Sequence, residues 1–156
     1  HTLRNIFILG LSLLDNCDCK AVQGCMDQRY KEYNPNVNVD DGSCRTILVP
    51  CNTDTKSGGD GVTKTTHSLG EHSGTVSLSY DMANVPDKLE VFYKNKRVCS
   101  TFDISDNQNG FVGGNNAAGC CNKISFNYPT TGNSFCTVIV TGGKNTEWTY
   151  TLGCPK

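Results

Sequence analysis

Ten cysteines in a chain of 156 residues constrain this protein more than any other feature of its sequence. Their even number, spread from Cys17 to Cys154, is the pattern of oxidised pairs in a secreted protein. The sequence lacks the close Cys-x-x-Cys and His-x-x-x-His pairs that zinc sites use. Between Cys17 and Cys154 the chain carries Cys19, Cys25, Cys44, Cys51, Cys99, Cys120, Cys121 and Cys136. The cysteines therefore predict disulfides and an extracellular or cell-surface location.

Charge excludes two classes of partner. The chain carries 14 basic and 15 acidic residues, with no basic stripe that nucleic acid would require and no polybasic cluster for an anionic membrane. Gly, Asn, Thr and Ser are abundant, which favours short strands and turns over long helices.

The first twenty residues (1–20) contain the apolar run LRNIFILGLSLL at positions 3–14. A dozen apolar residues are too few for a membrane-spanning helix, which needs about 20, so we expect no membrane span. The run resembles the apolar core of a signal peptide. As a retained strand it is apolar on both faces, which is typical of a strand inside a sheet.

Such a strand either fills the core of its own domain or is donated to a neighbouring subunit. Donation would build a head-to-tail filament, because a heterologous contact propagates instead of closing. The residues predicted to form this subunit interface are Leu3, Ile6, Phe7, Ile8, Leu9, Leu11, Leu13 and Leu14.

Residues 21–51 are predicted to form a separate cysteine-loop module. Residues 24–44 read GCMDQRYKEYNPNVNVDDGSC, with Asn34-Pro35 and Asp41-Gly42 as turn signals. A bond between Cys25 and Cys44 would stabilise the loop by about 3 kcal/mol in the chain-entropy model.

This loop resembles a motif family common on bacterial surfaces, GC-x-D-x(5 or 6)-YNP-x-A-x-x-DDGSC. The chain departs from the family at Val37, Asn38 and Val39, where small residues are usual. The resemblance implies a disulfide-closed loop in a secreted or cell-surface protein. The matching residues are Gly24, Cys25, Asp27, Tyr33, Asn34, Pro35, Asp40, Asp41, Gly42, Ser43 and Cys44.

Oxygen-bearing side chains at alternate positions of the loop are typical of calcium sites. The candidate ligands are Asp27, Asn34, Asn36, Asn38, Asp40 and Asp41. The glycine falls one place later than in an EF-hand, and no Glu closes the loop. The alternative is a network of Asx turns in which these side chains accept hydrogen bonds from backbone amides.

Residues 52–73 show no apolar periodicity and contain Gly58, Gly59 and Gly61, which predicts a flexible linker. Hydroxyl residues in such a linker are candidates for O-glycosylation. They are Thr63, Thr65, Thr66 and Ser68.

Residues 74–156 are predicted to form an antiparallel β-sandwich, jelly-roll-like, because alternating strands recur at short intervals. The predicted strands are 75–80, 89–93, 97–102, 123–128, 135–141 and 146–152. The last two form a predicted hairpin whose inner face carries Val138, Val140, Trp148, Tyr150 and Leu152.

Cysteine pairing in the sandwich follows from that hairpin. One register places Cys136 opposite Cys154, which predicts a cross-strand disulfide. Cys99 is expected to pair with Cys120 or Cys121, which would close the Asn- and Gly-rich loop between them. A bond between adjacent cysteines would be strained, so Cys120 and Cys121 are expected to have separate partners. Cys17, Cys19 and Cys51 are then left to pair among themselves and with the remaining member of the adjacent pair Cys120 and Cys121.

The sandwich also resembles a recurring secreted β-sandwich module of bacterial surface and exported proteins. The resemblance is carried by GTVSLSYDMANVPDKLEVFY, NGFVGG, ISFNYP and TEWTYTLGCP, about half of the chain. It implies a protein that binds, decorates or assembles and does not catalyse.

Enzymatic alternatives are few. His1 with His67 or His72 would be the ligands of a copper-dependent polysaccharide oxidase, although the latter two fall in the predicted linker. The sequence has no G-x-S-x-G elbow. Paired carboxylates for glycoside cleavage have their candidates in Asp81, Asp87, Glu90, Asp103 and Asp106, which more often cap turns.

Two function classes follow from these patterns, neither of them enzymatic. The first is a structural subunit of an extracellular filament or surface layer, with other copies of the chain as partners. The second is a monomeric module that binds calcium or carbohydrate, with glycans as partners and calcium as the cofactor.

Overall fold

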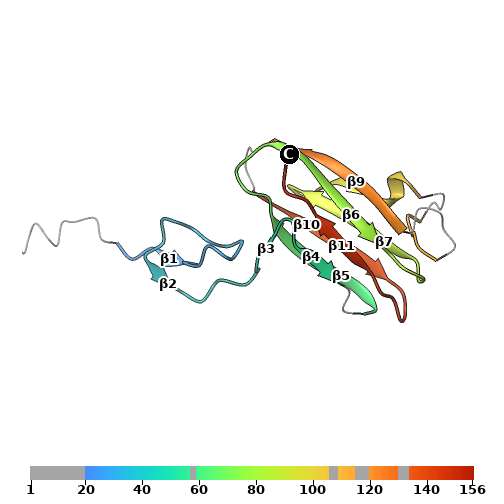
Figure 1. Cartoon of the computed structure of the whole chain (residues 1–156). Helices are drawn as coiled ribbons and strands as arrows, with labels where there is room; N and C mark the ends of the chain where they lie inside the picture. Colours follow the sequence, from blue (N-terminus) through green and yellow to red (C-terminus); the bar gives the residue numbers. More distant parts are fainter. Residues whose placement is uncertain (1–19, 57–58, 106–108, 115–119, 130–133) are drawn as a thin grey trace, which may run out of the picture. The chain divides into compact units, whose positions relative to one another are not determined.

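The computed structural model describes residues 20–56, 59–105, 109–114, 120–129 and 134–156 (Figure 1). The chain divides into two compact units, His1–Thr46 and Ile47–Lys156. The predicted strand in residues 1–14 lies outside the described residues.

The described part of the first unit is the cysteine loop. Strand β1 (Gln23–Gly24) pairs in parallel with β2 (Val39–Asp40), and a disulfide joins Cys25 to Cys44 as predicted. A Cβ added to Gly24 would lie 2.7 Å from a methyl group of Val37, so glycine lets the two segments approach closely. The disulfide and this contact hold the loop closed.

The second unit is a sandwich of two sheets, and the predicted all-β fold is confirmed. Within the described residues, one sheet has the order β3-β5-β10-β7-β8 and the other β4-β11-β6-β9 (Figure 1). The first contains β3 (Val49–Pro50), β5 (Gly61–Ser68), β10 (Phe135–Gly142), β7 (Asp87–Tyr93) and β8 (Lys96–Ser100). The second contains β4 (Asp54–Lys56), β11 (Thr149–Leu152), β6 (Gly74–Asp81) and β9 (Cys120–Tyr128). A short 3-10 helix, η1 (Thr101–Asp103), follows β8.

Strand pairing follows the jelly-roll topology. The antiparallel pairs β7–β8, β6–β9, β5–β10 and β4–β11 nest inside one another along the chain, as if one long hairpin were folded over itself. Strand β3 is an addition to this plan and pairs in parallel with β5 at the edge of its sheet. Pro50 is compatible with such an edge position.

Alternation along the strands places the core between the sheets. In β6, Val76, Leu78 and Tyr80 are buried, while Thr75 before them and Ser77 between them are exposed. Strands β7 and β10 alternate in the same way. Burying each such apolar side chain contributes about 2 kcal/mol relative to exposure.

The predicted linker at residues 52–73 is wrong. It contains β4 and the eight-residue strand β5, which pairs along its whole length with β10. Its inward positions carry the polar residues Thr63, Thr65 and His67, so the strand lacks the apolar alternation by which strands are predicted from sequence. The sandwich therefore begins near Ile47, not at residue 74, and includes Val49–Pro50 from the predicted loop module.

The predicted hairpin of the last two strands is also wrong. Strand β10 pairs with β5 and β7, whereas β11 pairs with β4 and β6 in the other sheet. The residues between them, 143–148, cross from one sheet to the other. Val138 and Val140 face the core from one side, and Tyr150 and Leu152 from the other, so their predicted burial is confirmed.

Disulfide pairing in the sandwich differs from the prediction for the same reason. Cys154 bonds to Cys51, because β11 lies next to β4 and the chain end meets the segment before β4. Cys136, predicted to pair with Cys154, and Cys99, predicted to pair with Cys120 or Cys121, are buried free thiols. Burial raises the pKa of both thiols to about 12, which keeps them protonated.

Candidate ligand-binding groove

A groove lies on the outer face of the four-stranded sheet, over β4, β11 and β6. The register of the three strands places its polar side chains side by side, because Thr149 lies opposite both Lys56 and Asp81. Two residues further along β11, Thr151 lies opposite both Asp54 and Ser79. Side chains two apart on a strand share a face, so these six polar residues form two parallel rows.

The groove consists of two adjoining hollows of about 400 and 410 Å³ that share Lys56, Asp81 and Thr149. Thr151 donates a hydrogen bond to Asp54, and Asp81 accepts one of 2.9 Å from the backbone of Ala83. These bonds fix the two carboxylates on the groove floor. Among the described residues, the ammonium of Lys56 makes no ion pair, so it is available to a ligand.

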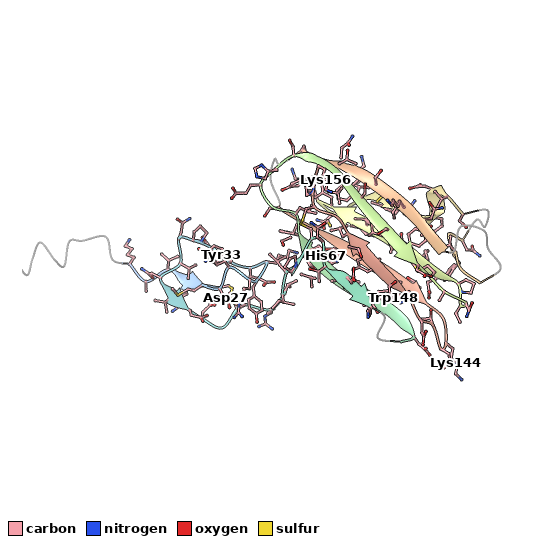
Figure 2. The ribbon with its side chains drawn as sticks, viewed as in Figure 1. Asp27, Tyr33, His67, Lys144, Trp148 and Lys156 are labelled. Atoms are coloured by element: carbon pink, nitrogen blue, oxygen red, sulfur yellow. A yellow bond between two sulfur atoms is a disulfide. The ribbon has the colours of Figure 1, made fainter. Side chains whose placement is uncertain are left out.

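One end of the groove is formed by Glu147 and Trp148 from the crossover between the sheets. The Trp148 ring stacks on Tyr150 with centroids 5.7 Å apart and an interplanar angle of 17°. Only 3% of Trp148 is exposed, as its predicted core position requires, although it also lines the groove. Figure 2 shows Trp148 near the start of β11.

The histidines proposed for copper are not brought together. His67 lies in β5, fully buried, and its Nε2 is 2.8 Å from the hydroxyl of Tyr150. Burial lowers the pKa of His67 below its usual 6.5, so its ring is neutral near pH 7. His72 is exposed on the β5–β6 connection, and His1 lies outside the described residues. His67 therefore serves the core, not a surface metal site.

The candidate calcium ligands of the cysteine loop form Asx turns. Asn34 accepts a hydrogen bond from the amide of Asn36, Asp40 from Gly42 and Asp41 from Ser43, at 2.9–3.0 Å. These bonds correspond to the Asx-turn alternative.

Two further candidates, Asn38 and Asp27, also have partners. Asn38 joins the backbone of Val22 and Lys20. Asp27 binds the guanidinium of Arg29, which lowers the pKa of Asp27 to about 2. Within the described ranges no three His, Cys, Asp or Glu side chains converge as a metal site, and calcium binding stays a prediction.

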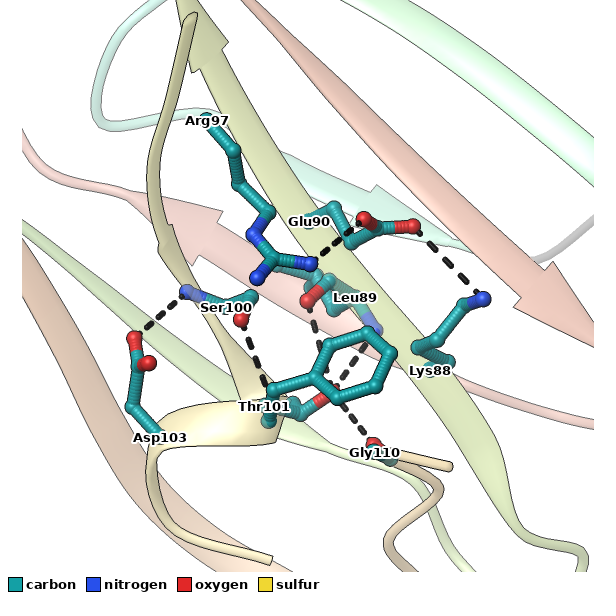
Figure 3. Close-up of polar contacts among 9 residues, drawn as sticks. Lys88, Leu89, Glu90, Arg97, Ser100, Thr101, Asp103 and Gly110 are labelled. Carbon is teal, nitrogen blue, oxygen red and sulfur yellow. Dashed lines mark hydrogen bonds and ion pairs between the residues drawn. The ribbon is translucent and has the colours of Figure 1, made fainter. Parts of the chain in front are cut away.

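The opposite face of the sandwich carries a paired charge cluster (Figure 3). Glu90 lies 3.7 Å from the Lys88 ammonium and 3.3 Å from the Arg97 guanidinium. Both cations also lie over the ring of Phe102, at 5.4 and 4.8 Å from its centroid. Because these charges already have partners, the cluster offers a ligand less than the groove does.

The helix η1, which follows β8, is held in place by hydrogen bonds of hydroxyl groups. Ser100 and Asp103 cap η1 reciprocally, and the buried Thr101 accepts a hydrogen bond from the amide of Leu89 and donates one of 2.6 Å to Gly110 (Figure 3). These bonds therefore stabilise the end of β8 and the loop that follows it.

Two predicted sets of residues remain. The proposed subunit interface, Leu3 to Leu14, lies outside the described residues. The O-glycosylation candidates Thr63, Thr65, Thr66 and Ser68 are half-buried in β5, so the linker argument for them is lost and their modification stays a prediction.

Five of the six groove residues were not predicted from the sequence, and Asp81 was predicted only as one of several acids. The alternating hydroxyl groups of β6 and β11 were visible as outward positions. Their arrangement beside β4 was not, because the pairing of β11 was wrongly predicted.

Comparison of this chain with family models, with curated proteins and with solved structures gave no match. No helix among the described residues is long and apolar enough to cross a membrane. The candidate site is thus defined by its own geometry.

Proposed function

We propose that this protein is an extracellular carbohydrate-binding module and that the groove over β4, β11 and β6 is its binding site. The observation that carries the proposal is the pair of polar rows, Lys56–Thr149–Asp81 and Asp54–Thr151–Ser79, along the two hollows. The two disulfides support an oxidising compartment, as in secreted proteins.

The chemistry of the groove suits sugar hydroxyls. Each sugar hydroxyl both donates and accepts, and the groove offers carboxylate oxygens, hydroxyl groups and the Lys56 ammonium, which makes no ion pair among the described residues. The floor is built on paired strands, which hold polar groups in place better than loops do. We infer binding without cleavage, in agreement with the role that the sandwich resemblance implies.

The test is a glycan array followed by titration calorimetry of the best ligand. Thr149→Val and Asp81→Asn should each weaken binding about tenfold, since one lost hydrogen bond is worth about 1–1.5 kcal/mol. Thr137→Val is the matched control, because Thr137 lies on the outer face of the other sheet. Equal effects of Thr149→Val and Thr137→Val, or no glycan binding at all, would refute the groove as a sugar site.

Calcium binding by the cysteine loop is a separate proposal, supported by its alternating oxygen ligands. Calorimetric titration with Ca²⁺ should show heat in the wild type and none in the double variant Asp40→Ala/Asp41→Ala. Heat that survives in this variant would place the ion elsewhere.

The filament hypothesis is the second candidate function and is supported by the apolar pattern of residues 3–14. The described sandwich already draws all eight jelly-roll strands from one chain, so the binding module is preferred. Electron microscopy of the native protein separates the two. Filaments that disappear on deletion of residues 1–14 would favour strand donation, and dispersed monomers favour the module.

A further inference from the structure

Asp87, the first residue of β7, is a buried carboxylate at the end of the sandwich where the chain crosses between sheets. None of its surface is exposed. Its Oδ1 accepts a hydrogen bond of 2.5 Å from the hydroxyl of Thr146, and its backbone pairs with Val112 through two bonds of 2.9 Å. Its Oδ2 is buried without a hydrogen-bond partner among the described residues.

The neighbouring chain is shaped around this carboxylate. Gly142 lies opposite Asp87 in the β10–β7 register. A Cβ on Gly142 would lie 2.7 Å from Oδ1 of Asp87 and 2.6 Å from a methyl group of Thr146. The absence of a side chain at position 142 therefore makes room for the Asp87–Thr146 contact.

Thr146 connects Asp87 to the groove. The next two residues, Glu147 and Trp148, form the groove end, and β11 with its two groove threonines begins directly after them. The crossover has other anchors among the described residues: the amide of Asn145 donates to Asp60, Thr146 makes a long turn bond of 3.4 Å to Gly143, and the Trp148 ring stacks on Tyr150 in the core. Thr146 directly precedes Glu147, so the Asp87–Thr146 bond positions this end of the groove together with the stacking of Trp148 on Tyr150.

We propose that Asp87 is a positioning residue that holds the Glu147–Trp148 end of the groove through Thr146, and that its ionisation loosens this end as the pH rises. This inference rests on the proposed function of the groove. It adds regulation: ligands of the groove bind more tightly in mildly acidic than in alkaline conditions.

Electrostatics supports this geometry. Burial raises the pKa of Asp87 from 3.8 to about 6, although hydrogen bonds from Thr146 and Gly143 partly oppose the shift. Among its described neighbours, residues 82–86, 109–114, Gly142 and Gly143 carry no ionisable side chain. Lys144 and Glu147 of the crossover are exposed, Asp60 accepts the Asn145 amide, and Lys88 and Glu90 are paired with each other on the outer face. Among the described residues no cation pairs with the buried charge.

The direction of the pH effect follows from the raised pKa. Below pH 4 the carboxyl group is neutral both in the closed crossover and in an open one, so the stability from burying the neutral form is fully present. As the pH rises through 6, the closed form must bury a charge and this stability is lost. With pKa values of 3.8 and about 6, the opening equilibrium increases about tenfold between pH 5 and pH 8.

The experiment uses Trp148, the only tryptophan of the chain, as a reporter that needs no ligand. Acrylamide quenching of its fluorescence in the full-length protein is measured from pH 4.5 to 8.5, with far-UV circular dichroism to verify that the fold persists. The wild type should show increasing quenching with a midpoint near pH 6. Quenching that does not change with pH would overturn the proposal.

Two variants assign the transition. Asp87→Asn keeps the acceptor for Thr146 but cannot ionise, so the transition should disappear. Thr146→Val removes the hydroxyl that favours the ionised form, so the midpoint should move to higher pH. Persistence of the wild-type transition in Asp87→Asn would assign it to another group, such as His67, and refute the inference.

Ligand binding then separates this inference from the proposed function. If a glycan binds the groove, its Kd at pH 8 should exceed that at pH 5 in the wild type and not in Asp87→Asn. A pH-dependent Trp148 signal without glycan binding would retain the positioning role and reject the carbohydrate site. Glycan binding with a pH-independent Trp148 signal would do the reverse.

Discussion

Polar side chains at inner positions of the sandwich favour one pairing of the strands over others. His67, Thr101 and Asp87 have no exposed surface, and each hydrogen-bonds to a residue of another segment. A buried polar group without a partner costs about 1–3 kcal/mol. Alternative pairings of these strands would break such bonds, so the polar residues favour one arrangement of the sheets.

His67 should make stability depend on pH. Its folded pKa is depressed, so its contribution is present above the unfolded value of 6.5 and is lost as the pH falls below it, when the unfolded state takes up a proton first. Urea unfolding at pH 7.5 and 5.0 should show a smaller loss of stability in His67→Gln than in the wild type. Equal losses would mean that His67 titrates normally.

Gly142 and Gly143 form a matched pair for a test of packing. Gly142→Ala should destabilise the protein by about 1–3 kcal/mol, since its Cβ would overlap Asp87 and Thr146. The nearest atom to a Cβ at Gly143 is a Val85 methyl group at 3.5 Å, an ordinary contact, so Gly143→Ala should change stability by less than about 0.5 kcal/mol. Thermal or urea unfolding measures both, and similar losses would contradict this account.

Among the elements, the short strands β3 and β4 depend on tertiary contacts. Strand β4 has three residues, two of them exposed, and β3 has two, so neither buries enough apolar surface to order itself. Cys51 lies between these two strands in the sequence, and its bond to Cys154 ties this segment to the residues after β11. The N–H of Asn52 also donates to Leu152, and the N–H of Cys154 to the side chain of Asn52. The Cys51–Cys154 disulfide therefore holds the groove edge formed by β4 at its N-terminal side.

Removal of this disulfide should be costly. The cysteines are separated by 103 positions, and a loop of that size stabilises the folded state by about 4–5 kcal/mol in the chain-entropy model. The double variant Cys51→Ala/Cys154→Ala should lose about this much in urea unfolding. A loss below about 1 kcal/mol would show that the strand contacts alone order this edge.

At the scale of the whole molecule, the sandwich has its own continuous core, which includes Leu69 directly after β5 and Leu152 at the end of β11. The cysteine loop has a disulfide of its own and few buried apolar residues, Cys25 and Val37 among them. Each unit is thus stabilised by different means, the sandwich by its core and the loop by its bond and Asx turns.

The sandwich should fold without the preceding residues. A fragment of residues 47–156 should form the Cys51–Cys154 bond and show the β-sheet circular dichroism and cooperative unfolding of a single core. Its melting temperature should lie within a few degrees of the full-length transition. An unfolded or aggregated fragment would show that residues 1–46 complete the fold.

The sequence by itself determined the class of fold and, in several of its strands, which residues face inward. Alternation predicted the strands near 75–80, 89–93 and 123–128 and the burial of Trp148 and Tyr150, because the two-residue period of a strand is local. The Cys25–Cys44 bond was predictable because both cysteines lie at the ends of one short loop. Only the tertiary structure decided which strands are neighbours. Alternation defines faces but not partners, so the separation of β10 from β11, the Cys51–Cys154 bond and the groove over β4, β11 and β6 did not follow from it. The strand β5 was missed because Thr63, Thr65 and His67 occupy inner positions, and polar residues are stable there only when hydrogen bonds and burial from distant segments compensate them.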